Sequence, residues 1–154
     1  TCALPILLAC AESVSTPAEQ PPTPKAVFVI VDGVPADVVE SVATPNLDAI
    51  AGASGYTRAW VGGVVGTDSE TPTVSAPIYQ SLLTGTWVNK HGVRTNAVRR
   101  PDYSYWDIFR IAKQHNPELK TALYSTWTDN RTKLLGDGLE AAGGRKLEIG
   151  RAHV

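Results

Sequence analysis

The sequence is poor in sulfur-containing residues: it has no methionine and two cysteines in 154 residues. Both cysteines, Cys2 and Cys10, lie within the first ten residues. A disulfide framework needs cysteines spread over the folded part, and a cysteine metal site needs closely spaced pairs. Neither arrangement is therefore available to the rest of the chain. Because the sequence starts at Thr1 without a methionine, we expect the reading frame to begin further upstream.

The sequence also lacks an excess of charge and a long apolar run. It has 14 Lys and Arg against 15 Asp and Glu residues, which gives a formal net charge of −1. Nucleic-acid binding rests on clustered basic side chains, and this balance gives no sign of such a surface. The apolar run at residues 3–9 is far shorter than the roughly 20 residues that span a bilayer. With 43% hydrophobic residues, the chain instead fits one globular domain.

The first 24 residues have the composition of an export signal followed by a linker. A short apolar stretch ends in Leu7, Leu8, Ala9 and Cys10, and a small residue before cysteine permits lipid attachment in bacterial lipoproteins. Residues 11–24 are Pro-, Ser-, Thr- and Glu-rich and too poor in apolar side chains to pack. We expect residues 1–10 to be a lipoprotein signal remnant and residues 11–24 a disordered linker. The alternative is an ordinary apolar N-terminus.

The lipoprotein interpretation also predicts where the protein works. A lipid on Cys10 would hold an exported bacterial protein at a membrane, in the periplasm or at the cell surface. The membrane would then be a partner only through that lipid anchor.

The last seven residues, 148–154, suggest a sequencing artefact. They can be back-translated in frame as GAG ATC GGA AGA GCA CAC GTC, which resembles a common short-read adaptor. We therefore expect this segment to be adaptor read-through and the chain to be an incomplete fragment. An ordinary polar tail is the alternative.

Apolar periodicity from Lys25 onward predicts alternating strands and helices. Strands are expected over 26–31, 56–61 and 121–124, and helices over 44–51, 75–85 and 101–115. Residues 129–144 are expected to form loop and partial helix. The alternation predicts an α/β fold, a mostly parallel sheet with helices on both faces, over residues 25–147.

Asp32 follows directly after the first expected strand. Residues 26–31 are continuously apolar and mostly β-branched, which is typical of a strand buried on both faces. A carboxylate at the end of such a strand is costly unless it is solvated, hydrogen-bonded or bound to a cation. Asp32 is therefore either a candidate ligand or a turn residue paired with Gly33.

Five segments taken together resemble one known family. They are residues 27–32, 44–48, 72–77, 83–85 and 91–93. Their order and spacing resemble the alkaline phosphatase superfamily, specifically its nucleotide pyrophosphatase/phosphodiesterase branch. The resemblance extends from Lys25 to about Leu135, and the combination is much more specific than any one segment. It implies that residues 25–147 are the N-terminal part of an alkaline-phosphatase-like hydrolase domain.

The resemblance implies roles for three residues. In that family, the aspartate after the first strand ligates one of two zinc ions, and the Thr or Ser that opens the next helix is the nucleophile on the same metal. These positions are Asp32 and Ser75. The family's phosphate-binding asparagine matches Asn96. The implied cofactors are two divalent metal ions, zinc in the family, and the implied substrate is a small phosphate ester or nucleotide.

Elementary chemistry supports these roles. A hydroxyl is a poor nucleophile at its ordinary pKa, and a divalent metal stabilises its alkoxide. The positive end of a helix favours an anionic phosphoryl group near Ser75, and the Asn96 amide would donate to a nonbridging oxygen. Taken singly, however, Ser75 is more often a helix cap and Asn96 a turn residue. His91 is interpreted as structural and His115 as a surface residue.

Two other functions stay open. The Ser75 block also resembles a sulfatase signature, but Tyr79 stands where that signature needs Arg, and Gly33 follows Asp32 where sulfatases have a second acid. A surface lipoprotein that keeps the fold as a binding module is the non-catalytic alternative. Asp32 and Ser75 cannot complete two metal sites, since each ion needs about three protein ligands. We therefore expect the complete parent protein to be an enzyme and this piece alone to be inactive.

Overall fold

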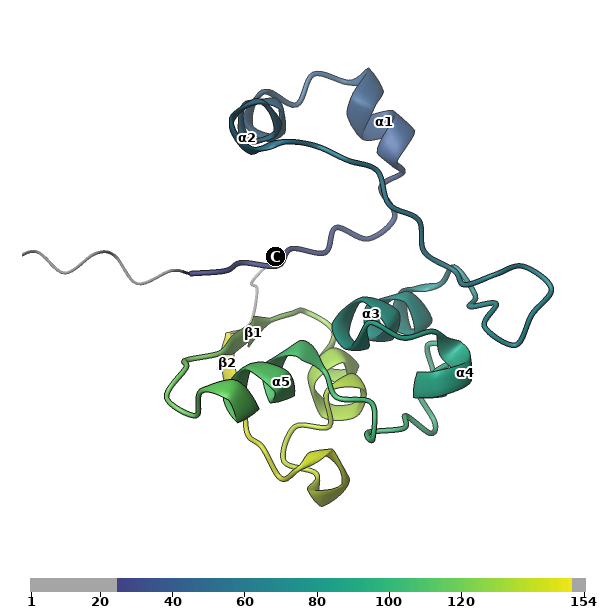
Figure 1. The fold of residues 1–154 in the computed structure, drawn as a ribbon, viewed down its shortest axis with the longest axis vertical. Coiled ribbons are helices and arrows are strands. Elements are labelled where there is room, and N and C mark those ends of the chain that lie inside the picture. The colour runs from purple at the N-terminus through teal and green to yellow at the C-terminus, as the bar shows by residue number, and fades with distance from the viewer. Residues whose placement is uncertain (1–24, 151–154) are drawn as a thin grey trace, which may run out of the picture.

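The computed structural model describes residues 25–150 (Figure 1). The expected signal remnant, the expected linker and the last four residues of the segment 148–154 lie outside them. The elements, in chain order, are helices α1 (Ala36–Ser41), α2 (Pro45–Ser54), α3 (Ser75–Thr84), α4 (Val88–His91) and α5 (Ile108–His115), strand β1 (Ala122–Tyr124), π-helix η1 (Asn130–Leu134), 3-10 helix η2 (Glu140–Ala142) and strand β2 (Glu148–Gly150). None of the described helices is long and apolar enough to cross a membrane.

Helix α3 lies at the centre of the packed part. It begins at Ser75 and ends before Gly85, whose left-handed conformation (φ 66°) lets its N–H bond to the carbonyl of Ser81. Glycine adopts this conformation without the steric cost of a Cβ, which explains why the helix stops there as the sequence predicts. The helix packs against α4 and η1.

Two small apolar clusters hold the packed part together. The first contains Ala76, Val93, Val98 and Leu134, with Tyr79 and Trp127 against it. The second contains Leu83, Leu135 and Leu147, with Phe109 and Leu123 against it. Because α3 contributes Ala76 to one cluster and Leu83 to the other, it connects the two.

The sheet consists of β1 and β2, which pair in parallel. Ala122, Leu123 and Tyr124 lie opposite Glu148, Ile149 and Gly150. The strand expected over 121–124 is therefore confirmed. The first three residues of the segment interpreted as adaptor read-through form β2. The larger sheet with helices on both faces is not confirmed by residues 25–150, where these two strands are the ones that pair.

The expected central strand over residues 26–31 is wrong. The segment forms no strand, and its side chains lie in solvent, with Val27 86% and Val31 67% exposed. A buried strand needs hydrogen-bonded neighbours on its sides. No strand of the described part lies beside this one, so the apolar pattern alone does not create a strand here.

The strand expected over 56–61 is wrong for a similar reason. Tyr56 and Arg58 instead turn toward α1, where the Tyr56 hydroxyl donates to Glu40 at 2.7 Å and the Arg58 guanidinium forms an ion pair with the same carboxylate. Further along, the Trp60 ring stacks on Trp87 with centroids 5.5 Å apart. Side-chain contacts with Glu40 of α1 and with Trp87, the N-cap residue of α4, therefore hold this segment in position. The segment does not pair as a strand.

The helix predictions agree better with the structure. Pro45 occupies the first position of α2, and the Thr44 hydroxyl bonds to Asp48 at 2.8 Å. Helix α5 starts only at Ile108, because Asp107 caps it by accepting from the N–H groups of Phe109 and Arg110. Helices α1 and α4 were not predicted. Figure 1 shows α1 and α2 standing apart from the group that contains α3, α4 and α5.

Candidate functional site

Asp32 and Ser75 meet where the extended N-terminal segment reaches the start of α3. The Ser75 hydroxyl donates a hydrogen bond of 2.7 Å to Oδ2 of Asp32. Asp32 lies at the turn after residues 26–31, just before Gly33, and is exposed. The structure thus brings together the two residues that the sequence identifies as candidate metal ligands.

Asn96 lies at the same end of α3. Its Oδ1 accepts the backbone N–H of Ala76 at 2.9 Å. The N-cap residue of the helix, Val74, has no side chain that accepts such a bond. Asn96 therefore acts as a cap from a distant part of the chain, and it satisfies one of the free N–H groups of the first helical turn.

The loop that carries Asn96 is fixed by Val98. This residue has a positive φ of 45°, an unusual conformation for a β-branched side chain. Its side chain is buried in the cluster that contains Ala76, and its N–H bonds to the carbonyl of Thr95 at 3.2 Å. Burial of Val98 offsets the backbone strain and holds Asn96 against the start of α3.

Tyr79 is a site residue that sequence reasoning did not select. It lies four positions after Ser75 on α3, so the two side chains share one face of the helix. Hydrogen bonds from the hydroxyls of Ser75 and, to a smaller extent, Tyr79 hold the pKa of Asp32 below its ordinary value. Burial, together with the Asp32 carboxylate, raises the pKa of Tyr79. The helical spacing from Ser75 was the signal that could have found it.

At the site, the Asp32 carboxylate accepts hydrogen bonds from two hydroxyl groups, those of Ser75 and Tyr79. Asp32 is ionised, and both neighbouring side chains are neutral donors. Within residues 25–150, no positive side chain forms a hydrogen bond or an ion pair with Asp32. An ionised oxygen donor beside a hydroxyl oxygen is an arrangement that suits a cation.

His91 serves the packing of α3 and α4. It is fully buried, its Nδ1 accepts the N–H of Val93 at 3.1 Å, and its Nε2 lies 3.0 Å from the Ser81 hydroxyl. Since Nδ1 is an acceptor, Nε2 carries the proton and donates to Ser81, which in turn donates to the carbonyl of Pro77. Burial, and secondarily the charge of Arg94, lowers the pKa of His91 to about 4. This agrees with the structural role expected for it.

A full metal centre is not assembled within residues 25–150. No group of three or more His, Cys, Asp or Glu side chains in this range is arranged to hold a metal ion. A zinc ion takes about three protein ligands even in a catalytic site. Asp32 and Ser75 therefore fit a partial ligand set for one ion, and these residues do not by themselves fit a two-metal centre.

The start of α3 nevertheless brings together a hydroxyl, a carboxylate and an amide. Ser75 offers a hydroxyl at the first position of a ten-residue helix, whose positive end favours an anionic group. Of the N–H groups of this first turn, that of Ala76 is bound by Asn96 and residue 77 is a proline without one. Asp32 holds that hydroxyl in place. Since Asn96 uses its oxygen to bind Ala76, its Nδ2 hydrogens are the part of the amide left to donate to a ligand.

A comparison with protein-family models matches most of the chain. The model of a family described as type I phosphodiesterase / nucleotide pyrophosphatase matches residues 26–145. No curated protein and no solved structure matches the chain. The matched range contains Asp32, Ser75 and Asn96.

Proposed function

Because the chain belongs to the type I phosphodiesterase / nucleotide pyrophosphatase family, we propose that it carries the nucleophile-bearing part of a hydrolase of phosphodiester or pyrophosphate bonds. The observation that supports this most directly is the 2.7 Å hydrogen bond between Ser75 and Asp32 at the start of α3. That bond places the hydroxyl of the candidate nucleophile at the positive end of a helix and beside a candidate metal ligand.

The proposed nucleophile is the Ser75 Oγ. The hydroxyl gives up its proton to solvent as Oγ attacks phosphorus, a new O–P bond forms, and the bond from phosphorus to the leaving group breaks. The leaving oxygen takes up a proton from solvent. The product is a covalent phosphoseryl enzyme, which water then hydrolyses to regenerate the hydroxyl. In this scheme Asp32 fixes the direction of the Ser75 hydroxyl before attack, because its Oδ2 accepts a hydrogen bond from that hydroxyl.

Asn96 is the proposed donor to the phosphoryl group. Its Nδ2 hydrogens would bind a nonbridging oxygen, on which negative charge develops during transfer. The bond from Ala76 N–H to its Oδ1 orients the amide plane and therefore aims those hydrogens. Tyr79, which shares a helix face with Ser75 and hydrogen-bonds to Asp32, adds a neutral donor at the rim of the site.

We further propose that the working enzyme uses two divalent metal ions, zinc by resemblance, with Asp32 and Ser75 among the ligands of one. A bound metal supplies Lewis-acid stabilisation of the Ser75 oxygen. The described residues offer only this partial ligand set. The 154-residue chain alone is therefore proposed to be inactive, and activity is proposed for the complete parent protein.

The family acts on small phosphodiester or nucleotide substrates, and we propose the same class here. The proposed location is the periplasm or cell surface of a bacterium, with Cys10 as the lipid-bearing residue. Cys10 lies outside the described residues, and the proposal rests on the sequence pattern around it.

The deciding experiment is an assay of the full-length protein encoded by the complete gene. An aryl phosphodiester should be hydrolysed, a chelator should stop the reaction, and added zinc should restore it. Hydrolysis of an aryl sulfate in place of the phosphodiester would indicate a sulfatase. Absence of turnover on either substrate, with metal bound, would favour a binding module.

A further inference from the structure

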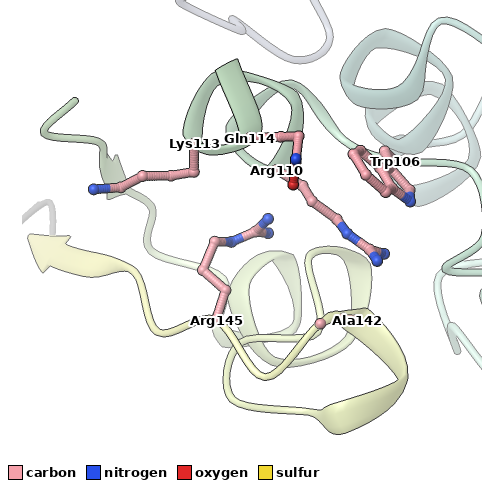
Figure 2. Close-up of a pocket in the computed structure, with 7 residues that line it drawn as sticks. Trp106, Arg110, Lys113, Gln114, Ala142 and Arg145 are labelled. Carbon is pink, nitrogen blue, oxygen red and sulfur yellow. The ribbon is translucent and has the colours of Figure 1, made fainter. Parts of the chain in front are cut away.

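A cavity of about 280 Å³ lies between α5 and the loop that follows η2, and it contains none of the candidate site residues (Figure 2). Helix α5 and its N-terminal approach contribute side chains at helical spacing. The last residue of η2 and the loop after it contribute the opposite wall. The lining residues are Trp106, Arg110, Lys113, Gln114, Ala142, Gly143 and Arg145. The cavity is therefore bordered by three cationic side chains.

Arg145 is the least satisfied of these cations. Its Nη2 bonds to Oδ2 of Asp107 at 2.8 Å, and its side chain is 12% exposed. Its Nε and Nη1 are buried and have no hydrogen-bond partner. Figure 2 shows its guanidinium extending from the loop toward α5. Buried donors without acceptors are costly, so an acceptor from outside the chain would relieve this cost.

Arg110 and Lys113 lie at the border of the cavity, and each donates a hydrogen bond to a neutral backbone carbonyl. Arg110 lies over the Trp106 ring, with its guanidinium carbon 4.3 Å from the ring centroid, and donates to the carbonyl of Tyr103 at 3.0 Å. The Lys113 ammonium donates to the carbonyl of Pro117 at 2.9 Å. Both partners are neutral carbonyls, so neither bond neutralises the cation.

The charge balance indicates the kind of ligand. Arg110, Lys113 and Arg145 carry three positive charges, and Asp107, which bonds Arg145, carries one negative charge. A net charge of two positive units complements a phosphate, which carries −1.5 to −2 at neutral pH. A volume near the lower end of ligand sites admits a small ligand. Arginine is also the side chain best suited to phosphate oxygens.

We propose that this cavity binds a small phosphate dianion, either inorganic phosphate or the phosphate of a monoester, through the unpartnered nitrogens of Arg145. Arg110 and Lys113 contribute charge from α5. The proposal does not depend on the function of Ser75, because the two sites share no residue.

The test is calorimetric titration of the full-length protein with inorganic phosphate, at fixed ionic strength and with a chelator present. The Ser75→Ala background removes the candidate nucleophile from the measurement. We expect saturable binding at one site, and Arg145→Gln should weaken it at least tenfold. A parallel titration with glycerol phosphate distinguishes the two sources, since tighter binding of either one identifies the ligand and supports the site.

Two further variants keep the test decisive. Gln114→Glu places a negative charge at the border of the cavity on an exposed residue, and it should weaken binding even if Arg145→Gln fails to fold. Arg99→Gln removes one positive charge, as Arg145→Gln does, but from an exposed position away from the cavity. It should leave binding unchanged. Absence of saturable binding, or an equal loss in Arg99→Gln, would overturn the proposal.

Discussion

The hydroxyl of Ser75 donates a 2.7 Å hydrogen bond to Asp32, which lies 43 positions earlier in the chain. The bond joins the extended segment after Lys25 to the first turn of α3. The family resemblance implies that Ser75, the donor, is a nucleophile and that Asp32, the acceptor, is a metal ligand. Substituting either residue should therefore change the orientation of the other side chain.

Replacing Ser75 by alanine should abolish turnover of an aryl phosphodiester by the full-length protein, because no covalent intermediate can form. The measurement is kcat, together with mass spectrometry of the phosphorylated peptide. Ser104→Ala is the matched control, since Ser104 also donates a 2.7 Å bond to an aspartate, Asp102. Equal activity in the wild type and in Ser75→Ala would remove Ser75 from the mechanism.

Asp32→Asn should lose bound metal together with rate. The substitution keeps the size of the side chain but removes the charge that a divalent cation requires. Metal content after dialysis and kcat are measured on the same samples, with Asp102→Asn as the control for loss of a carboxylate that accepts from a serine. A variant that keeps its full metal content would show that Asp32 is not a ligand.

Asn96→Ala should retain metal and lose about 10²–10³ in rate, the usual effect of removing one donor to a developing oxyanion. It should also cost about 1 kcal/mol of stability, since the Ala76 N–H loses its acceptor. Asn96→Asp separates the two effects, because it keeps the acceptor and removes the amide donor. Asn89→Ala, at an exposed position on α4, is the control. Unchanged rate in both Asn96 variants would exclude the proposed donor role.

Stability should fall with acid in the window set by His91. Its pKa is about 4 in the folded chain against 6.5 ordinarily, so the unfolded chain binds the extra proton between these values. Neutral, buried His91 therefore contributes to the free energy of unfolding. This contribution amounts to roughly 3 kcal/mol, is complete above about pH 6.5 and is lost as the pH falls toward 4. Urea unfolding across this range measures it. His115→Gln should keep the slope and His91→Gln should lose it. A flat profile in the wild type would contradict the assignment.

Cys10→Ser in the full-length protein should move it from the membrane fraction to the soluble fraction. A mature bacterial lipoprotein depends on the lipids of this cysteine for a firm anchor. Fractionation and immunoblotting measure the change, with Cys2→Ser as the matched control. If the Cys10→Ser protein still sediments with membranes, the lipoprotein interpretation is wrong.

Local signals in the sequence predicted the helices best. Thr44 and Pro45 indicate the start of α2, and Gly85 indicates the end of α3. These signals can be read from the sequence because each residue acts on the helix end at its own position. Strands over 26–31 and 56–61 could not be predicted in this way. A strand depends on partners elsewhere in the chain, and apolar composition does not reveal whether they are present. Helices α1 and α4 are short and have no side-chain N-cap.

The candidate site was predictable only in part. Motif order brought Asp32, Ser75 and Asn96 to attention, and the structure places all three at one end of α3. The sequence did not reveal that Asn96 caps this helix, because the bond crosses 20 positions. It also did not reveal the cavity at Arg145, whose cations come from two separate parts of the chain.

The exposed apolar segment 26–31 has a consequence for the protein in solution. Five of its six residues are β-branched or aromatic, the segment carries no charge and contains neither proline nor glycine, and it lies open to solvent. Segments of this composition pair with copies of themselves and form fibrillar aggregates. Samples of this chain should therefore lose solubility as concentration rises, and a charged residue placed within the segment should restore it.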